Sequence, residues 1–265
     1  MTRVKIRKFG SPMPVFREIP VGGGEALWSV PEETPVAFIY NGRNHAVMLA
    51  TPADLADFAA GFSLTERIVD AVDDILSIDI HFDERGVDIR MDVAAKAVER
   101  FDVRQQRRNL VGRTGCGVCG VENAEVFFEP LPKVSQQKTR FEDKALLKAI
   151  AALPAHQALN EKTRTVHAAA WAGPGGEIVL AREDVGRHNA LDKLLGALAM
   201  ARAPLDDGFV IVSSRCSCEL VEKAARRGVR AILSVSGPTA FAIRKADEAN
   251  LSLYVRSGDG VAAVN

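Results

Sequence analysis

From Thr165 onward, short apolar segments alternate with segments that have the period of an amphipathic helix. The expected order is strand 166–171, strand 177–181, helix 187–201, strand 209–212, helix 218–227, strand 231–235, helix 239–249 and strand 251–255. Short strands that are apolar along their length and separated by helices are typical of a sheet buried on both faces. The sequence therefore predicts an α/β fold in this half, with a mixed sheet and helices on both faces.

The first part of the chain predicts an α+β arrangement built from hairpins. Residues 1–34 are rich in glycine and proline and predict an irregular arm with room for one strand. Asn41-Gly42 separates two apolar runs, which is a strong local signal for a hairpin. Alternating residues on both sides of 83–86 predict a second hairpin with strands 75–83 and 87–93.

Helices are expected at three places before residue 154: one between the two hairpins and two after the second hairpin. Thr51 suits a helix N-cap and Pro52 the first helical position, ahead of apolar residues at helical spacing. Residues 94–108 predict a basic helix and residues 141–153 another, with a short strand at 126–128 between them. We place a domain boundary near residues 130–140, which gives an N-terminal domain over 1–135 and a C-terminal domain over 136–265.

Composition excludes several classes of protein. The chain has 34 basic and 34 acidic residues and no net charge, so no global field recruits nucleic acid or an anionic membrane. The N-terminal residues lack the apolar core of a signal peptide, and no apolar run approaches the roughly 18 residues of a membrane helix. Four cysteines are too few for a disulfide scaffold. We therefore expect a cytoplasmic protein whose thiols are reduced.

Two of these cysteines, Cys116 and Cys119, lie among the glycines of residues 112–120. Glycine allows positive φ and close approach of the backbone to a partner. Arg113 lies in this loop, and further arginines precede it over residues 104–108. Guanidinium groups favour thiolate over thiol, and the thiolate is the form that attacks sulfur or binds metal. The pattern indicates sulfur chemistry.

Three interpretations of the dithiol compete. A thioredoxin-like redox site would begin a helix after a strand, which the flanking glycines disfavour. A structural zinc site needs two more ligands, and Cys216 with Cys218 could supply them, although their one-residue gap departs from the usual knuckle spacing. A persulfide carrier needs a lowered thiol pKa and a nearby acceptor site, and the sequence supports both.

Polar residues gather where three predicted strands give way to helices, in residues 182–193, 213–219 and 234–239. Ligands of open α/β sheets bind beyond the carboxyl ends of strands, and helix N-termini offer free N–H groups to anions. Arg187 and His188 could reach a phosphate, and Asp184 could orient His188. The three junctions could line one rim that suits a phosphorylated, nucleotide-like ligand. The alternative interpretation is a capping network with exposed charge, and the helix bearing Lys223 is expected to present a solvated face.

Several motifs together resemble the formate dehydrogenase accessory sulfurtransferase (FdhD) family. They are the Cys-Gly-Val-Cys loop at 112–120, the run Arg-Glu-Asp-Val-Gly-Arg-His-Asn-Ala-Leu-Asp-Lys at 182–193, and residues 213–219. The resemblance extends through residues 61–66 and 166–170 and so covers most of the chain. Several motifs in the same order are hard to obtain by chance.

The resemblance implies a sulfur carrier. Family members take sulfur from a cysteine desulfurase onto a loop cysteine and pass it to the molybdenum cofactor, a bis(molybdopterin guanine dinucleotide), before this enters formate dehydrogenase. Cys116 matches the persulfide-bearing cysteine, and Cys119 the supporting thiol. The C-terminal domain would be similar in fold to cytidine deaminases. Deaminase chemistry is not supported, because residues 167–169 lack the glutamate of H-x-E and no Pro-Cys-x-x-Cys follows.

The resemblance also implies where the cofactor would bind as an acceptor. The family's cofactor-binding turn corresponds to Tyr254, Val255, Arg256, Ser257, Gly258 and Asp259. Together with Arg256, the candidates for holding the phosphates and the guanine are Arg187, His188 and Arg215. A homodimer is compatible with this interpretation. The alternatives are a non-catalytic chaperone that escorts the molybdenum cofactor with a redox or metal clip, and a zinc-stabilised nucleotide-binding module.

Overall fold

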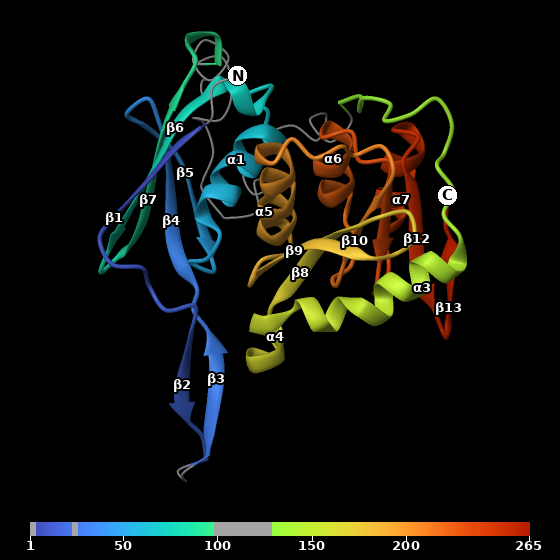
Figure 1. The fold of residues 1–265 in the computed structure, drawn as a ribbon, viewed down its shortest axis with the longest axis horizontal. Coiled ribbons are helices and arrows are strands. Elements are labelled where there is room, and N and C mark those ends of the chain that lie inside the picture. Colours follow the sequence, from blue (N-terminus) through green and yellow to red (C-terminus); the bar gives the residue numbers. More distant parts are fainter. Residues whose placement is uncertain (1–3, 23–25, 98–128) are drawn as a thin grey trace.

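The computed structural model describes residues 4–22, 26–97 and 129–265, and Figure 1 shows their arrangement around two sheets. The first sheet has the strand order β1-β6-β7-β4-β5, and α1 (Leu55–Thr65) covers one of its faces. Its strands are β1 (Lys5–Phe9), β4 (Thr34–Tyr40), β5 (Arg43–Ala50), β6 (Ile75–Asp83) and β7 (Gly86–Val93). Phe38, Phe58 and Ile80 are fully buried in the core between the sheet and α1.

Both predicted hairpins are confirmed. β4 pairs antiparallel with β5 around Asn41 and Gly42, which both have positive φ, at 46° and 79°. These are the backbone angles that Asn-Gly adopts most easily. β6 pairs antiparallel with β7 around a turn that ends at Gly86. A short 3₁₀ turn, η1 (Val72–Asp74), precedes β6.

The prediction of an irregular arm over residues 1–34 is wrong. β1 pairs parallel with β6, some seventy residues further along the chain, so no local pattern marks it as a sheet strand. β2 (Phe16–Pro20) and β3 (Leu27–Pro31) form a separate two-stranded ribbon that projects from the body of the molecule (Figure 1). Gly22, which has a positive φ of 65°, follows β2.

The predicted start of the first helix is also wrong. α1 begins at Leu55, and its N-cap is Asp54 rather than Thr51. Thr51 is fully buried and bonds to the second half of the chain: its N–H donates to the Asp184 carboxylate, and its hydroxyl oxygen accepts from the Val185 N–H. A tertiary contact therefore uses the polar groups that would otherwise cap the helix.

The second sheet has the order β13-β12-β11-β10-β8-β9 and confirms the predicted mixed sheet with helices on both faces. β10, β11 and β12 are parallel, whereas β8, β9 and β13 join by antiparallel pairing. The strands are β8 (His167–Ala172), β9 (Ile178–Asp184), β10 (Phe209–Val212), β11 (Ala231–Ser234), β12 (Ser252–Ser257) and β13 (Gly260–Ala263). The sequence analysis did not predict β13.

Helices cover this sheet unequally. α5 (Arg187–Met200), α6 (Cys218–Arg226) and α7 (Ala240–Glu248) pack on one face around Leu191, Leu194 and Ile232. α3 (Asp143–Ala152), confirmed within the predicted 141–153, packs on the other face. It leads through a 3₁₀ turn, η3 (Leu153–His156), into the unpredicted α4 (Ala158–Thr163).

The two halves meet where α1 crosses α5. Gly61 and Gly196 form the crossing, and a methyl group on Gly61 would lie 1.7 Å from the Asp192 carbonyl oxygen. Only glycine permits backbones to approach this closely. The division into domains at residues 130–140 stays a prediction. Most of the predicted basic helix at 94–108, and the strand at 126–128, lie outside the described residues.

Candidate functional site

Three strand-to-helix junctions meet at one edge of the second sheet. β9, β10 and β11 all run in the same direction, since β8 is antiparallel to both β9 and β10. Their carboxyl ends therefore lie at one edge, where α5, α6 and α7 begin. We call this edge the rim: residues 184–189, 213–219 and 234–239, with His167 at the start of β8. Its position is that of ligand sites in open α/β sheets.

Hydrogen bonds join the three junctions to one another. His188 Nε2 lies 2.8 Å from Glu219 Oε2 and 3.4 Å from Ser217 Oγ, which links the first junction to the second. The Cys216 N–H donates to the Gly237 carbonyl oxygen, and the Ser234 hydroxyl donates to the Ser214 carbonyl oxygen. The rim is thus one continuous structure.

The partner predicted for His188 is wrong. Asp184 does not orient this imidazole, because it is fully buried and points to the interface between the halves. It forms an ion pair of 2.7 Å with Lys193 and accepts hydrogen bonds from the N–H groups of Thr51 and Gly186. Glu219 holds His188 instead, and the His188 hydrogen bond is the main reason why the pKa of the Glu219 carboxyl is lowered.

Several hydrogen-bond donors of the rim have no acceptor among the described residues. Among the described residues, no side chain caps the N-terminus of α5 or of α6. Arg187 is half-buried, and its Nε is a buried atom with no hydrogen-bond partner in the described part of the chain. Burial, reinforced by the neighbouring Arg187 and His188, lowers the pKa of His167. Free helix N–H groups beside a guanidinium group form an environment for an anion.

A family model described as the FdhD/NarQ family matches residues 31–260 of this sequence. The chain is 46% identical over 240 residues to the sulfur carrier protein FdhD of Cupriavidus necator, covering 89% of this chain and 82% of that protein. It is 47% identical over 244 residues to the protein of the same name from Xanthomonas oryzae pv. oryzae, covering 91% and 86%. The chain belongs to the FdhD/NarQ family.

A crystal structure described as a formate dehydrogenase accessory protein, from Desulfotalea psychrophila, has the same fold as this FdhD/NarQ chain. The TM-score is 0.72 at 23% identity, and the match covers 95% of this chain and 97% of that one. The resemblance to the FdhD family drawn from the sequence is therefore confirmed, together with the mixed α/β fold.

The cysteine pair of this FdhD/NarQ family member, Cys116 and Cys119, lies outside the described residues, so its predicted role stays a prediction. Cys216 and Cys218 are described. Burial raises the pKa of the Cys216 thiol to about 12, and burial together with Glu219 raises that of Cys218. Both shifts disfavour the thiolate that zinc requires. Within the described ranges, no three His, Cys, Asp or Glu side chains are placed to hold a metal ion.

The residues predicted for cofactor binding lie in two places. Arg187 and His188 belong to the rim, and Arg215 lies exposed on it. The cofactor-binding turn implied by the resemblance joins β12 to β13. Because β12 lies next to β11 and runs parallel to it, this turn is at the same edge of the sheet as the rim. Arg256 to Asp259 are exposed there and Val255 is half-buried. The Tyr254 side chain does not belong to this exposed turn. It packs on the face of the sheet that α3 covers, and its hydroxyl donates to the Thr139 carbonyl oxygen.

The expectation that the helix bearing Lys223, α6, presents a solvated face there is wrong. This lysine is buried, and its Nζ lies 2.8 Å from Asp192 Oδ2 and 3.0 Å from Thr65 Oγ1. The sequence around Lys223 could not predict this burial, because the residues that pair with Lys223 lie in two other helices, α1 and α5. No helix in the described ranges is both long and apolar enough to cross a membrane.

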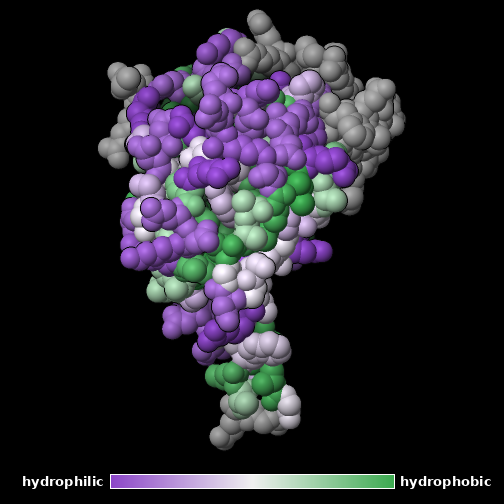
Figure 2. Space-filling view, turned by 90° about the vertical axis from the view of Figure 1, so that its right-hand side faces the viewer, coloured by the Kyte–Doolittle hydropathy of each residue, from purple (hydrophilic) through white to green (hydrophobic). Residues whose placement is uncertain are grey.

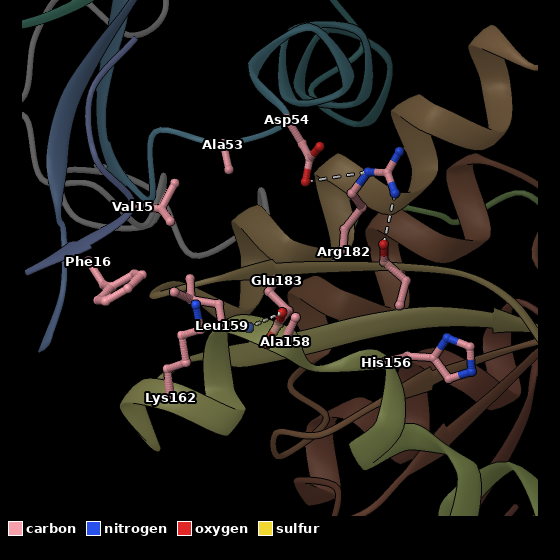
Figure 3. A pocket seen from close by; sticks show the side chains of 11 residues that line it. Val15, Phe16, Ala53, Asp54, His156, Ala158, Leu159, Lys162, Arg182 and Glu183 are labelled. Atoms are coloured by element: carbon pink, nitrogen blue, oxygen red, sulfur yellow. Dashed lines mark hydrogen bonds and ion pairs between the residues drawn. The ribbon is translucent and has the colours of Figure 1, made fainter. Parts of the chain in front are cut away.

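A hollow lies away from the rim, between the base of the β2–β3 ribbon and α4 (Figure 3). Its volume is about 280 Å³. Two of its charged side chains are already used within the chain: Glu183 accepts the N–H groups of Leu159 and Asn160 at 2.8 Å each, and Arg182 pairs with Asp57 at 2.7 Å. The hollow was not predicted from the sequence.

Proposed function

We propose that this FdhD/NarQ protein is a sulfur carrier required for formate dehydrogenase activity, with Cys116 as the residue that bears the sulfur. The two curated relatives described above are named sulfur carrier proteins. The arginines of residues 104–113 favour the Cys116 thiolate, which is the attacking form. A carrier of this kind needs reduced thiols, so we assign it to the cytoplasm.

The loading step is a thiolate–persulfide exchange with a cysteine desulfurase as the donor. The Cys116 thiolate attacks the terminal sulfur of the desulfurase persulfide and forms a new S–S bond. The original S–S bond breaks, and the desulfurase cysteine leaves as a thiolate, so no external oxidant or reductant is consumed. Cys119 is the second thiol, which stabilises or resolves the persulfide.

The acceptor in this proposal is the molybdenum cofactor, Mo-bis(molybdopterin guanine dinucleotide), bound as a substrate before it enters formate dehydrogenase. The observation that supports the rim as its site is the buried Arg187 Nε without a partner in the described chain, beside the uncapped starts of α5 and α6. His188, Arg215 and the exposed Arg256 add positive or donor groups for phosphate and guanine. The rim carries the donor types that a diphosphate requires.

Incubation with a cysteine desulfurase and ³⁵S-labelled cysteine tests the carrier role. The protein should acquire label that a thiol reductant removes, and Cys116→Ala should acquire none. Cys218→Ser is the matched control, because this half-buried cysteine takes no part in the proposed loading step and its variant should acquire label normally. A wild-type protein that supports formate dehydrogenase but never acquires labile sulfur would instead be a chaperone for the cofactor.

A further inference from the structure

His188 is held at the rim by one of its two ring nitrogens. Its Nε2 lies 2.8 Å from Glu219 Oε2, and the Ser217 hydroxyl donates to the same carboxylate oxygen at 3.0 Å. The pKa of the Glu219 carboxyl is lowered chiefly by the hydrogen bond with His188, so this group is ionised at neutral pH. A carboxylate can only accept hydrogen bonds, so Nε2 must carry a hydrogen. Glu219 therefore fixes the tautomer of the neutral His188 ring.

This cluster does not have the geometry of a nucleophile with its activating base. In a catalytic triad of serine, histidine and acid, the hydroxyl and the acid contact different nitrogens of the imidazole. Here Ser217 Oγ, at 3.4 Å, and Glu219 Oε2 both lie beside Nε2 of His188. The other nitrogen, Nδ1, has no hydrogen-bond partner among the described residues, and the side chain is 18% exposed. Nδ1 is thus the atom with which His188 can contact a ligand.

Charge determines what this nitrogen can contact. Exposed apolar residues of the molecule gather along the projecting β2–β3 ribbon (Figure 2). The side chains around His188 are instead charged or titratable and come from four elements: Arg187 from α5, Glu219 from α6, His167 from β8 and Asp184 from β9. Glu219 favours a positive charge on His188, and Arg187 opposes it. Asp184 is already paired with Lys193.

His167, the other imidazole of the rim, stays neutral in the free protein. It is half-buried, and burial together with Arg187 and His188 lowers its pKa. Of the two rings, only His188 has a carboxylate placed to balance a second ring proton. A phosphate oxygen can only accept hydrogen bonds, and the neutral His188 ring presents a lone pair at Nδ1. A phosphate at this position therefore requires the protonated ring.

We propose that the rim takes up a proton from solvent when it binds the diphosphate of the nucleotide, and that Glu219 directs this proton to Nδ1 of His188. The inference rests on the proposed function, which assigns the diphosphate of the cofactor to this rim. The protonated Nδ1 donates to a phosphate oxygen beside Arg187 and the starts of α5 and α6. Glu219 does not touch the ligand. It is a positioning residue that holds the Nε2 hydrogen and balances the charge of the imidazolium.

Titration calorimetry with diguanosine diphosphate, two guanosines joined by a 5′–5′ diphosphate, tests the proton uptake. This probe carries the guanine and the diphosphate of the cofactor, and its phosphodiester groups do not titrate between pH 5 and pH 8. Its affinity for the wild-type protein should rise about tenfold from pH 8 to pH 6, as expected for one added hydrogen bond to a charged group. Compared between two buffers of different ionisation enthalpy, binding at pH 7 should take up about half a proton.

Three variants assign the proton to its site. His188→Asn keeps an amide N–H near the position of Nδ1 but does not titrate, so its affinity should change less than about twofold between pH 8 and pH 6. His156→Asn is the matched control, because this exposed histidine lies on η3 outside the rim and its variant should keep the wild-type pH dependence. Glu219→Gln should lose about half or more of the uptake at pH 7, since its amide can donate to Nε2 and leave the hydrogen of the neutral ring on Nδ1.

The outcomes separate this inference from the proposed function. Equal binding enthalpies in the two buffers overturn the inference and leave the rim as the binding site. A Glu219→Gln protein with the proton uptake of wild type shows that Glu219 is only structural, and uptake lost in His167→Asn but kept in His188→Asn assigns the proton elsewhere; either result overturns it. If the probe does not bind at all, the inference fails together with the assignment of the rim. The ³⁵S loading of Cys116 does not involve the rim, so it reports on the carrier role independently.

Discussion

Removing the Lys223 ammonium group should destabilise the protein more than removing any surface charge. Lys223 Nζ lies 2.8 Å from Asp192 Oδ2, 3.0 Å from Thr65 Oγ1 and 3.1 Å from Glu66 Oε1. Asp192 is 1% exposed, so Lys223→Met leaves a buried carboxylate without its cation. Breaking one partner of a buried ion pair costs about 3–5 kcal/mol. For a chain of this length that corresponds to a fall in Tm of about 5–9 °C.

The pH dependence of this loss has a definite sign. Burial raises the pKa of the Asp192 carboxyl above its ordinary value, while Lys223 and Thr65 oppose the shift. Without Lys223 the pKa rises further. A carboxyl whose pKa is higher in the folded state favours folding at low pH, and this contribution is lost as the pH rises through the folded pKa. The difference in Tm between Lys223→Met and wild type should therefore narrow from pH 8 to pH 5.

Thermal unfolding followed by circular dichroism across that pH range measures both effects. Lys148→Met is the control, because Lys148 is exposed and lies 4.0 Å from its partner Glu177, so its Tm should change by less than about 1 °C. Lys223→Met combined with Asp192→Asn should recover part of the loss, since the buried charge is gone. A Lys223→Met protein within about 2 °C of wild type at pH 8, or a gap that widens on acidification, would refute the reasoning.

Three further outcomes are expected. Gly61→Ala should destabilise the chain by about 3 kcal/mol or more in urea unfolding, because its methyl group meets the α5 backbone, whereas Gly237→Ala, with open space at its Cβ, should have little effect. Arg187→Gln should weaken guanosine diphosphate binding by about tenfold or more in titration calorimetry, and Arg90→Gln on the first sheet should not. Cys216 should resist iodoacetamide in the native protein at pH 8 and react only after unfolding, as peptide mass mapping would show; rapid native labelling would contradict its burial and its raised pKa.

Much of the fold was predictable because it depends on neighbours in sequence. Asn41-Gly42 specifies its hairpin through backbone angles that these two residues adopt readily. The alternation after Thr165 specifies strands and helices whose boundaries agree with the structure to within a few residues. β1 escaped prediction because its pairing with β6 is parallel and distant, and short charged strands such as Lys5–Phe9 carry little apolar signal.

The candidate site also has a part that the sequence predicted and a part that it could not predict. The sequence by itself determined that polar junctions follow several strands of one sheet, and parallel strands bring their carboxyl ends to a common edge. Only the tertiary structure decided which side chains meet there: Glu219 rather than Asp184 holds His188, and Lys223 turns inward to Asp192. A charged residue's partner is set by whichever element packs beside it, and burial then makes that choice energetically large. Sequence spacing contains neither the packing nor the burial.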